Sequence, residues 1–175
     1  MRTLVAAFCC LLIATSLQGQ KNKREPLTAA QMDKIAEAGI EPNARVGLYT
    51  QFLNEHADAI KALTNRAKSD ARASKMNDSL EDFTALMDEL GDNLDTLSDR
   101  KADIRKSLKP LTEAVPRWQG ILRTLIGEPG FNLARKEAIE SSEDLAEQAD
   151  RLLKEQTDYF AKHPDEAGQD RWEPK

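Results

Sequence analysis

The chain has 175 residues, a length that favours one domain with extensions over two full domains. Hydrophobic residues make up 40% of it, aromatic residues 5% and charged residues 31%, which is typical of exposed helices and argues against an all-β fold. The net charge of -5 becomes -6 once Arg2 is removed with the leader described next, so we expect no binding to nucleic acid. Composition therefore indicates an all-α protein but no particular activity.

Residues 1–19 have the order of a secretory signal peptide. Arg2 is followed by eleven apolar residues, 4–14, and then by small and polar ones. Eleven apolar residues are too few to cross a bilayer, which needs about 20. We expect cleavage near residues 16–19, no membrane span afterwards, and a secreted or periplasmic protein.

Both cysteines, Cys9 and Cys10, lie inside this apolar run and are removed with it. The mature chain then has no disulfide, although its compartment is oxidising. A thiolate nucleophile, a zinc thiolate site and a c-type haem attachment each need a cysteine, so all three are excluded.

A polar leader and a short helix are expected over residues 20–41, with Thr28 as the helix cap and Gly39 just after the helix. Pro42 then opens a longer helix with a one-sided apolar stripe, formed by Val46, Tyr49, Leu53, His56, Ile60, Leu63 and Ala67. Residues 74–79 are rich in side chains that compete with helix, so we place a turn there and end this helix at about residue 74.

The strongest periodicity in the chain follows, over residues 79–126. Of 15 heptad positions, 14 are apolar, whereas a hydrophobic content of 40% would give about six. The a positions are Leu80, Met87, Leu94, Lys101, Leu108, Val115 and Leu122, and the d positions are Met76, Phe83, Leu90, Leu97, Ile104, Leu111, Trp118 and Leu125. The pattern predicts one continuous helix, roughly 70 Å long.

Three residues interrupt this pattern. Lys101 is its one polar position, and we expect its ammonium to reach solvent, to fix the register or to meet an acid from another helix. Pro110 and Pro116 fall at outer c and b positions, where we expect kinks, with a break as the alternative.

Residues 127–130, with the sequence GEPG, predict a turn, and a third long helix follows over residues 132–162. Residues 164–175 read as a flexible polar tail, whose Trp172 docks back on the bundle, stays free or anchors a partner. We therefore predict an elongated antiparallel three-helix bundle over residues 42–163. Because its longest helix would outreach the other two, a homodimer could cover the exposed apolar seam.

The candidates for a metal site are four aspartates and one histidine. The aspartates are Asp88, Asp92, Asp95 and Asp99, which line one outer face of the long helix. They lack the ligand order of a calcium loop, so we expect a solvated face, or one paired with bases of the preceding helix. His56 lies on an inner stripe, where it could ligate haem or metal with a methionine such as Met87, but we expect a packed histidine. With no thiol and one internal histidine, the chain has poor material for a catalytic triad, and we expect no enzyme, cofactor or metal.

Residues 27–31, with the sequence LTAAQ, resemble the LTxxQ element of small secreted helical stress proteins of the periplasmic Spy and CpxP type. The resemblance implies an ATP-independent holdase chaperone. The second copy expected in that family is absent, because Ala67 and Val115 stand where its glutamine should be. The same five residues also make a good helix start, since a threonine cap precedes a glutamine at the third helical position.

A long amphipathic bundle without a catalytic set favours a non-enzymatic secreted or periplasmic binding or scaffold protein of the cell envelope. Its partner would be an unknown protein or a second copy of the chain. The alternatives are the holdase that the resemblance implies and a carrier of a small ligand, haem or metal.

Overall fold

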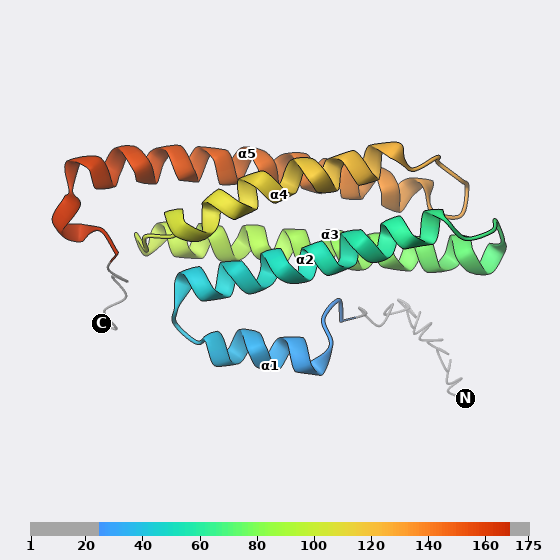
Figure 1. The fold of residues 1–175 in the computed structure, drawn as a ribbon, viewed down its shortest axis with the longest axis horizontal. Helices are drawn as coiled ribbons and strands as arrows, with labels where there is room; N and C mark the ends of the chain where they lie inside the picture. Colours follow the sequence, from blue (N-terminus) through green and yellow to red (C-terminus); the bar gives the residue numbers. More distant parts are fainter. Residues whose placement is uncertain (1–24, 169–175) are drawn as a thin grey trace, which may run out of the picture.

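The computed structural model describes residues 25–168 (Figure 1). The predicted signal peptide, its cleavage region and Trp172 lie outside these residues. The regular structure of the described part is entirely helical, which confirms the all-α prediction. The helices are α1 Ala29–Ala38, α2 Pro42–Thr64, α3 Asp70–Asp99, α4 Arg105–Thr124 and α5 Asn132–Lys162, and they are followed by the short 3-10 helix η1 Pro164–Glu166.

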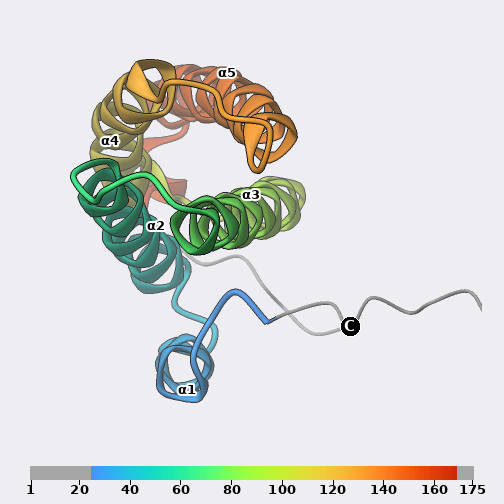
Figure 2. The same cartoon turned by 90° about the vertical axis from the view of Figure 1, so that its right-hand side faces the viewer.

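Helices α2 to α5 form a four-helix bundle in place of the predicted three-helix bundle. Both α2 and α5 pack against α3 and against α4, so that α3 and α4 occupy opposite corners (Figure 2). Neighbouring helices in the sequence run in opposite directions along the bundle (Figure 1). The connection from α3 to α4 therefore crosses the end of the bundle diagonally.

Helix α1 lies outside this bundle and packs on α2 (Figure 2). It begins with a capping box, in which the Gln31 N–H donates to Thr28 Oγ1 at 3.3 Å and the Thr28 N–H donates to Gln31 Oε1 at 2.9 Å. It ends at Ala38 and is followed by Gly39, whose φ of +55° favours glycine. Leu27 and Ile35 bury their side chains in the shared core.

The turn predicted over residues 74–79 is wrong. Helix α2 ends at Thr64, and α3 already begins at Asp70, so residues 74–79 are helical. The N-terminus of α3 is set by Ser69, whose side chain accepts the Arg72 N–H at 3.2 Å. An N-cap of this kind satisfies a free backbone donor. The polar side chains within residues 74–79 are exposed or half-buried along a helix that continues through them.

The continuous helix predicted over residues 79–126 is also wrong, because the chain reverses over residues 100–104. The Ala102 N–H donates to the Leu97 carbonyl and the Lys101 N–H to the Ser98 carbonyl, which is the hydrogen-bond pattern of a Schellman motif. Lys101 occupies its left-handed position with φ +56°, where glycine is usual. Lys101 thus marks the end of α3, not a position on a seam.

The apolar heptad positions are nevertheless all buried, those of α3 as well as those of α4. Both helices turn their stripes to the same core, so the pattern is the same for a continuous helix and for two antiparallel ones. Pro110 and Pro116 lie at exposed positions inside α4, and the helix continues through both, so the alternative of a break at the prolines is wrong.

Trp118 lies at the centre of the core. Its ring meets that of Phe83 edge to face, with centroids 5.9 Å apart, and its Nε1 donates to Asn54 Oδ1 at 2.8 Å. These contacts join α4 to α3 and to α2.

No helix in the described part of the chain is long and apolar enough to cross a membrane.

Candidate functional site

The four aspartates of the predicted stripe are exposed on α3, and the side chains of two of them accept hydrogen bonds from α5, where the prediction placed bases of the preceding helix. Asp88 Oδ1 accepts the Ser141 hydroxyl at 2.7 Å, and Asp95 Oδ1 accepts Gln148 Nε2 at 2.7 Å. Among residues 25–168, no three His, Cys, Asp or Glu side chains form a group that could hold a metal ion.

His56 is half-buried on α2, beneath the segment that leads into α1. Burial lowers the pKa of His56 below its usual 6.5, although the carboxylate of Asp82 and the carbonyl of Pro26 act in the opposite direction. These surroundings fit a packed histidine that joins the leader segment to α2 and α3.

The most elaborate polar arrangement lies at one end of the bundle. We call this end the loop end; it comprises residues 98–105 and residues 155–168. Gln156 of α5 is 8% exposed, and its amide binds two backbone groups of the α3–α4 connection. Its Oε1 accepts the Ile104 N–H at 3.0 Å, and its Nε2 donates to the Ala102 carbonyl at 3.0 Å.

Asn43 at the start of α2 binds the same connection from another helix. Its Nδ2 donates to the Asp103 carbonyl at 2.8 Å, and its Oδ1 accepts the Ser107 N–H at 3.0 Å. Two amide side chains therefore bind backbone donors and acceptors of the connection and of the first turn of α4, which fixes the backbone conformation there.

An ion pair completes this end. Arg105 Nη2 lies 2.7 Å from Asp103 Oδ2, and its guanidinium lies 4.5 Å from the centre of the Phe160 ring. The Gly168 N–H also donates to Asp103 Oδ2, at 2.9 Å. Hydrogen bonding to Arg105 lowers the pKa of the Asp103 carboxyl below its usual value.

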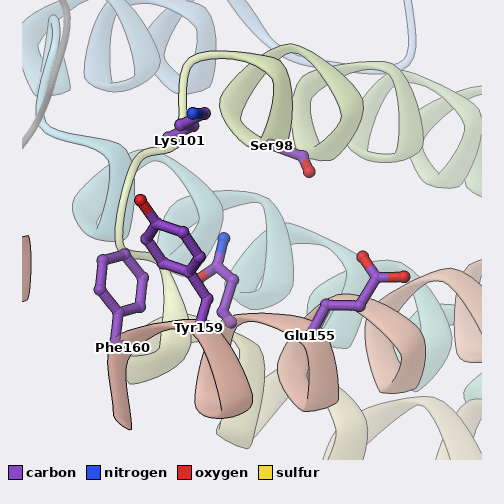
Figure 3. A pocket seen from close by; sticks show the side chains of 6 residues that line it. Ser98, Lys101, Glu155, Tyr159 and Phe160 are labelled. Carbon is purple, nitrogen blue, oxygen red and sulfur yellow. The ribbon is translucent and has the colours of Figure 1, made fainter. Parts of the chain in front are cut away.

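A groove of about 210 Å³, which we call the Lys101 groove, opens beside this connection (Figure 3). It is lined by Ser98, Lys101, Glu155, Gln156, Tyr159 and Phe160. The two aromatic rings stand edge to face with centroids 5.2 Å apart, and the Tyr159 hydroxyl donates to Glu166 Oε2 at 2.5 Å. Phe160 is only 4% exposed, whereas Tyr159 is half-buried, so the Tyr159 ring is the accessible aromatic surface of the groove. An aromatic ring flanked by one cation and one carboxylate suits the binding of an apolar side chain with charged neighbours.

Sequence reasoning singled out Lys101 but not Gln156 or Asn43. Gln156 follows Leu152 by four residues, which places it on the inner, apolar stripe of α5. A polar residue at such a position is the sequence signal that could have identified it. Asn43 follows Pro42 in the first turn of α2, where an asparagine has many ordinary roles, and nothing in its pattern indicates the α3–α4 connection.

No family model matches the chain, and no curated protein or solved structure matches it. The resemblance to small stress proteins therefore rests on the five residues 27–31 alone. In the structure these residues include the capping box of α1 and the buried side chain of Leu27.

Proposed function

We propose that the protein is a non-enzymatic scaffold of the cell envelope, secreted or periplasmic, that binds a partner protein through the Lys101 groove. The observation that carries this proposal is the left-handed backbone of Lys101. A lysine there costs about 1 kcal/mol or more relative to glycine, and such strain is concentrated at functional sites. A glycine at position 101 would avoid this strain but would have no ammonium group. The ammonium of Lys101 lies on the edge of the groove.

The fixed backbone around the groove supports this proposal. Gln156 and Asn43 bind the connection from two sides, so little conformational freedom remains to be lost when a partner binds. The Tyr159 ring supplies the type of side chain that is enriched in protein interfaces. A partner with an apolar side chain beside an acidic one would fit the Tyr159 ring and the Lys101 ammonium.

Export through residues 1–19 is part of the proposal and has its own test. The protein should appear in the periplasmic or secreted fraction of its host, with an intact mass that starts after a residue between 16 and 19. A cytoplasmic protein that retains residue 1 would overturn export while leaving the groove to be tested separately.

The groove is tested by site-specific photo-crosslinking in the host. A photoreactive amino acid replaces Glu155, which lines the groove, or Glu147, which is exposed two helical turns earlier on α5. We expect one discrete adduct from position 155, its loss when Lys101→Glu is added, and no such adduct from position 147. The same products from both positions would overturn the proposal, and an adduct of twice the chain mass would identify a second copy as the partner.

A holdase would behave differently in an aggregation assay. A scaffold with one defined groove should not protect a denatured client at substoichiometric amounts. Substoichiometric protection that survives Lys101→Glu would overturn the scaffold function in favour of the chaperone.

A further inference from the structure

The end of the bundle opposite the loop end is basic. It carries the connections from α2 to α3 and from α4 to α5 (Figure 1), and Figure 2 shows it face on. We call it the basic end; it comprises residues 61–73 and 121–135, the two connections with one helical turn on either side. These residues have a net charge of +4, whereas the whole chain has -5. Their two acids are Asp70 and Glu128, and their six bases are Lys61, Arg66, Lys68, Arg72, Arg123 and Arg135.

Two large aliphatic side chains of the basic end are exposed. Ile126 follows α4 and is 75% exposed, and Leu133 in the first turn of α5 is 69% exposed. Each adjoins a residue of one close contact, because a Cβ atom on Gly127 would lie 2.5 Å from Asn132 Oδ1. An exposed apolar patch with a polar rim marks a surface that binds a protein or a membrane.

The backbone that carries these two side chains is held in place. Arg135 of α5 donates from Nε to the Leu122 carbonyl at 3.1 Å and from Nη2 to the Arg123 carbonyl at 3.4 Å, which ties the start of α5 to the end of α4. The ion pair between Glu128 and Arg72 ties the same connection to α3. Little conformational freedom is therefore lost when this end binds a ligand.

Cations of the α2–α3 connection are accessible beside this patch. Arg66 is exposed, and the side chain of Lys68 is 71% exposed although its ammonium lies 3.5 Å from Glu128 Oε1. An ion pair so open to solvent contributes little, so the Lys68 ammonium can turn to an anionic ligand.

We propose that the basic end docks on an anionic lipid surface. Ile126 and Leu133 enter the boundary between headgroups and acyl chains, while Arg66 and Lys68 bind lipid phosphates. Each Lys or Arg near an anionic membrane strengthens binding about fivefold. Acyl chains adapt to protruding aliphatic side chains of any shape, and the same combination of cations and apolar side chains is typical of segments that lie in the membrane interface.

The charge distribution also orients the bundle. The acidic remainder of the chain is repelled by an anionic surface, so the basic end faces the membrane and the long axis points away from it. Helix α3 has 30 residues and is about 45 Å long, which keeps the Lys101 groove far from the membrane. Docking at the basic end is independent of the groove and of any partner bound there.

The test is co-sedimentation of the protein, purified from its host, with vesicles that mix phosphatidylglycerol and phosphatidylcholine. We expect the binding constant to fall at least about tenfold on vesicles of phosphatidylcholine alone, and to fall as the salt concentration rises. Arg66→Glu/Lys68→Glu should weaken binding to the mixed vesicles at least about tenfold. Ile126→Ser/Leu133→Ser should also weaken it at least about tenfold, because two aliphatic groups no longer leave water.

Two matched controls leave the basic end intact. Lys106→Glu/Lys109→Glu makes the same change of charge at exposed positions on α4, near the loop end. Met32→Ser/Ile40→Ser removes two other exposed large hydrophobic side chains, on α1 and just after it. Both variants should bind like the unmodified protein, since these positions lie much further from the membrane than the Debye length of about 10 Å.

The outcomes separate a lipid surface from other partners. Binding through any other part of the chain would survive both basic-end variants, and this result would overturn the proposal. Failure to bind the mixed vesicles would overturn it as well. If the protein instead bound polyglutamate, and Arg66→Glu/Lys68→Glu abolished that binding, the ligand of the basic end would be an acidic protein.

Discussion

Arg72 of α3 and Glu128 of the α4–α5 connection form an ion pair, with 3.0 Å between Arg72 Nη1 and Glu128 Oε1. A helix continuous over residues 79–126 would place the two residues at opposite ends of a rod roughly 70 Å long. Arg72 Nε also donates to the Leu63 carbonyl at 3.1 Å, so one guanidinium joins the end of α2 to the start of α3 and to the α4–α5 connection. The pair is a direct consequence of the chain reversal at Lys101.

The reversal predicts a short distance between the first turns of α3 and the end of α4. With spin labels at Lys75 and Thr124, we expect a separation below about 30 Å, because the two sites lie at the same end of a bundle two helices wide. A continuous helix would give about 70 Å. Labels at Lys75 and Asp99, both within α3, serve as the control and should give about 36 Å in either case.

Lys101→Gly should not destabilise the protein. Glycine adopts φ +56° without the clash of a Cβ atom, and this gain of about 1 kcal/mol is partly offset by the greater freedom of the unfolded chain. We expect a free energy of unfolding in denaturant that is unchanged or higher by up to about 1 kcal/mol.

Lys109→Gly is the matched comparison, since Lys109 is an exposed lysine inside α4. It should lower the free energy of unfolding by about 1 kcal/mol, because glycine is a poor helix former. Equal losses in the two variants would show that Lys101 is not in a left-handed conformation in solution.

Gln156→Leu should be strongly destabilising. It leaves the buried Ile104 N–H and Ala102 carbonyl without partners, which costs roughly 1–3 kcal/mol for each group. We expect a loss of about 2–5 kcal/mol in chemical denaturation. Gln148→Leu removes an amide of the same helix whose partners are the Gly91 carbonyl and the exposed Asp95. A loss there as large as that of Gln156→Leu would contradict the account.

The Asp103 carboxyl at the loop end should make the free energy of unfolding depend on pH. Its carboxyl pKa is lowered in the folded protein, mainly by Arg105, so its contribution to stability is present above the unfolded pKa of about 4 and is lost as the pH falls through the folded pKa. Asp103→Asn should cost about 1–2 kcal/mol at pH 7, because a charge-assisted pair is lost. Urea unfolding at several pH values should show that the difference in free energy of unfolding between the unmodified protein and Asp103→Asn shrinks below pH 4. A difference that stays constant down to pH 2 would exclude the Asp103–Arg105 pair as its cause.

The apolar periodicity predicted which residues are buried but not how the chain connects them. As heptad positions, Leu97 and Ile104 are predicted to lie in the core, and both are buried. The reversal between them depends on a Schellman motif whose left-handed position holds Lys101 instead of glycine, so the usual sequence signal for a helix end is absent.

The partners of the polar residues were beyond sequence reasoning for a related reason. The spacing of Asp88 and Asp95 predicted a shared outer face, which the structure has, but Ser141 and Gln148 lie 53 residues further along the chain. Hydrogen bonds between distant helices depend on which helices pack side by side. The predicted three-helix topology does not have the helix neighbours of the observed four-helix bundle. The same holds for Gln156, whose role depends on the diagonal α3–α4 connection.

On the proposed function, the protein works by binding another polypeptide. A native mass spectrum of the protein purified from the envelope fraction of its own host tests it most directly. We predict a complex of defined stoichiometry with a second protein or a second copy of the chain, which is lost when Lys101→Glu is introduced. A monomer that is bare, or that carries only a ligand of a few hundred daltons, would contradict the claim.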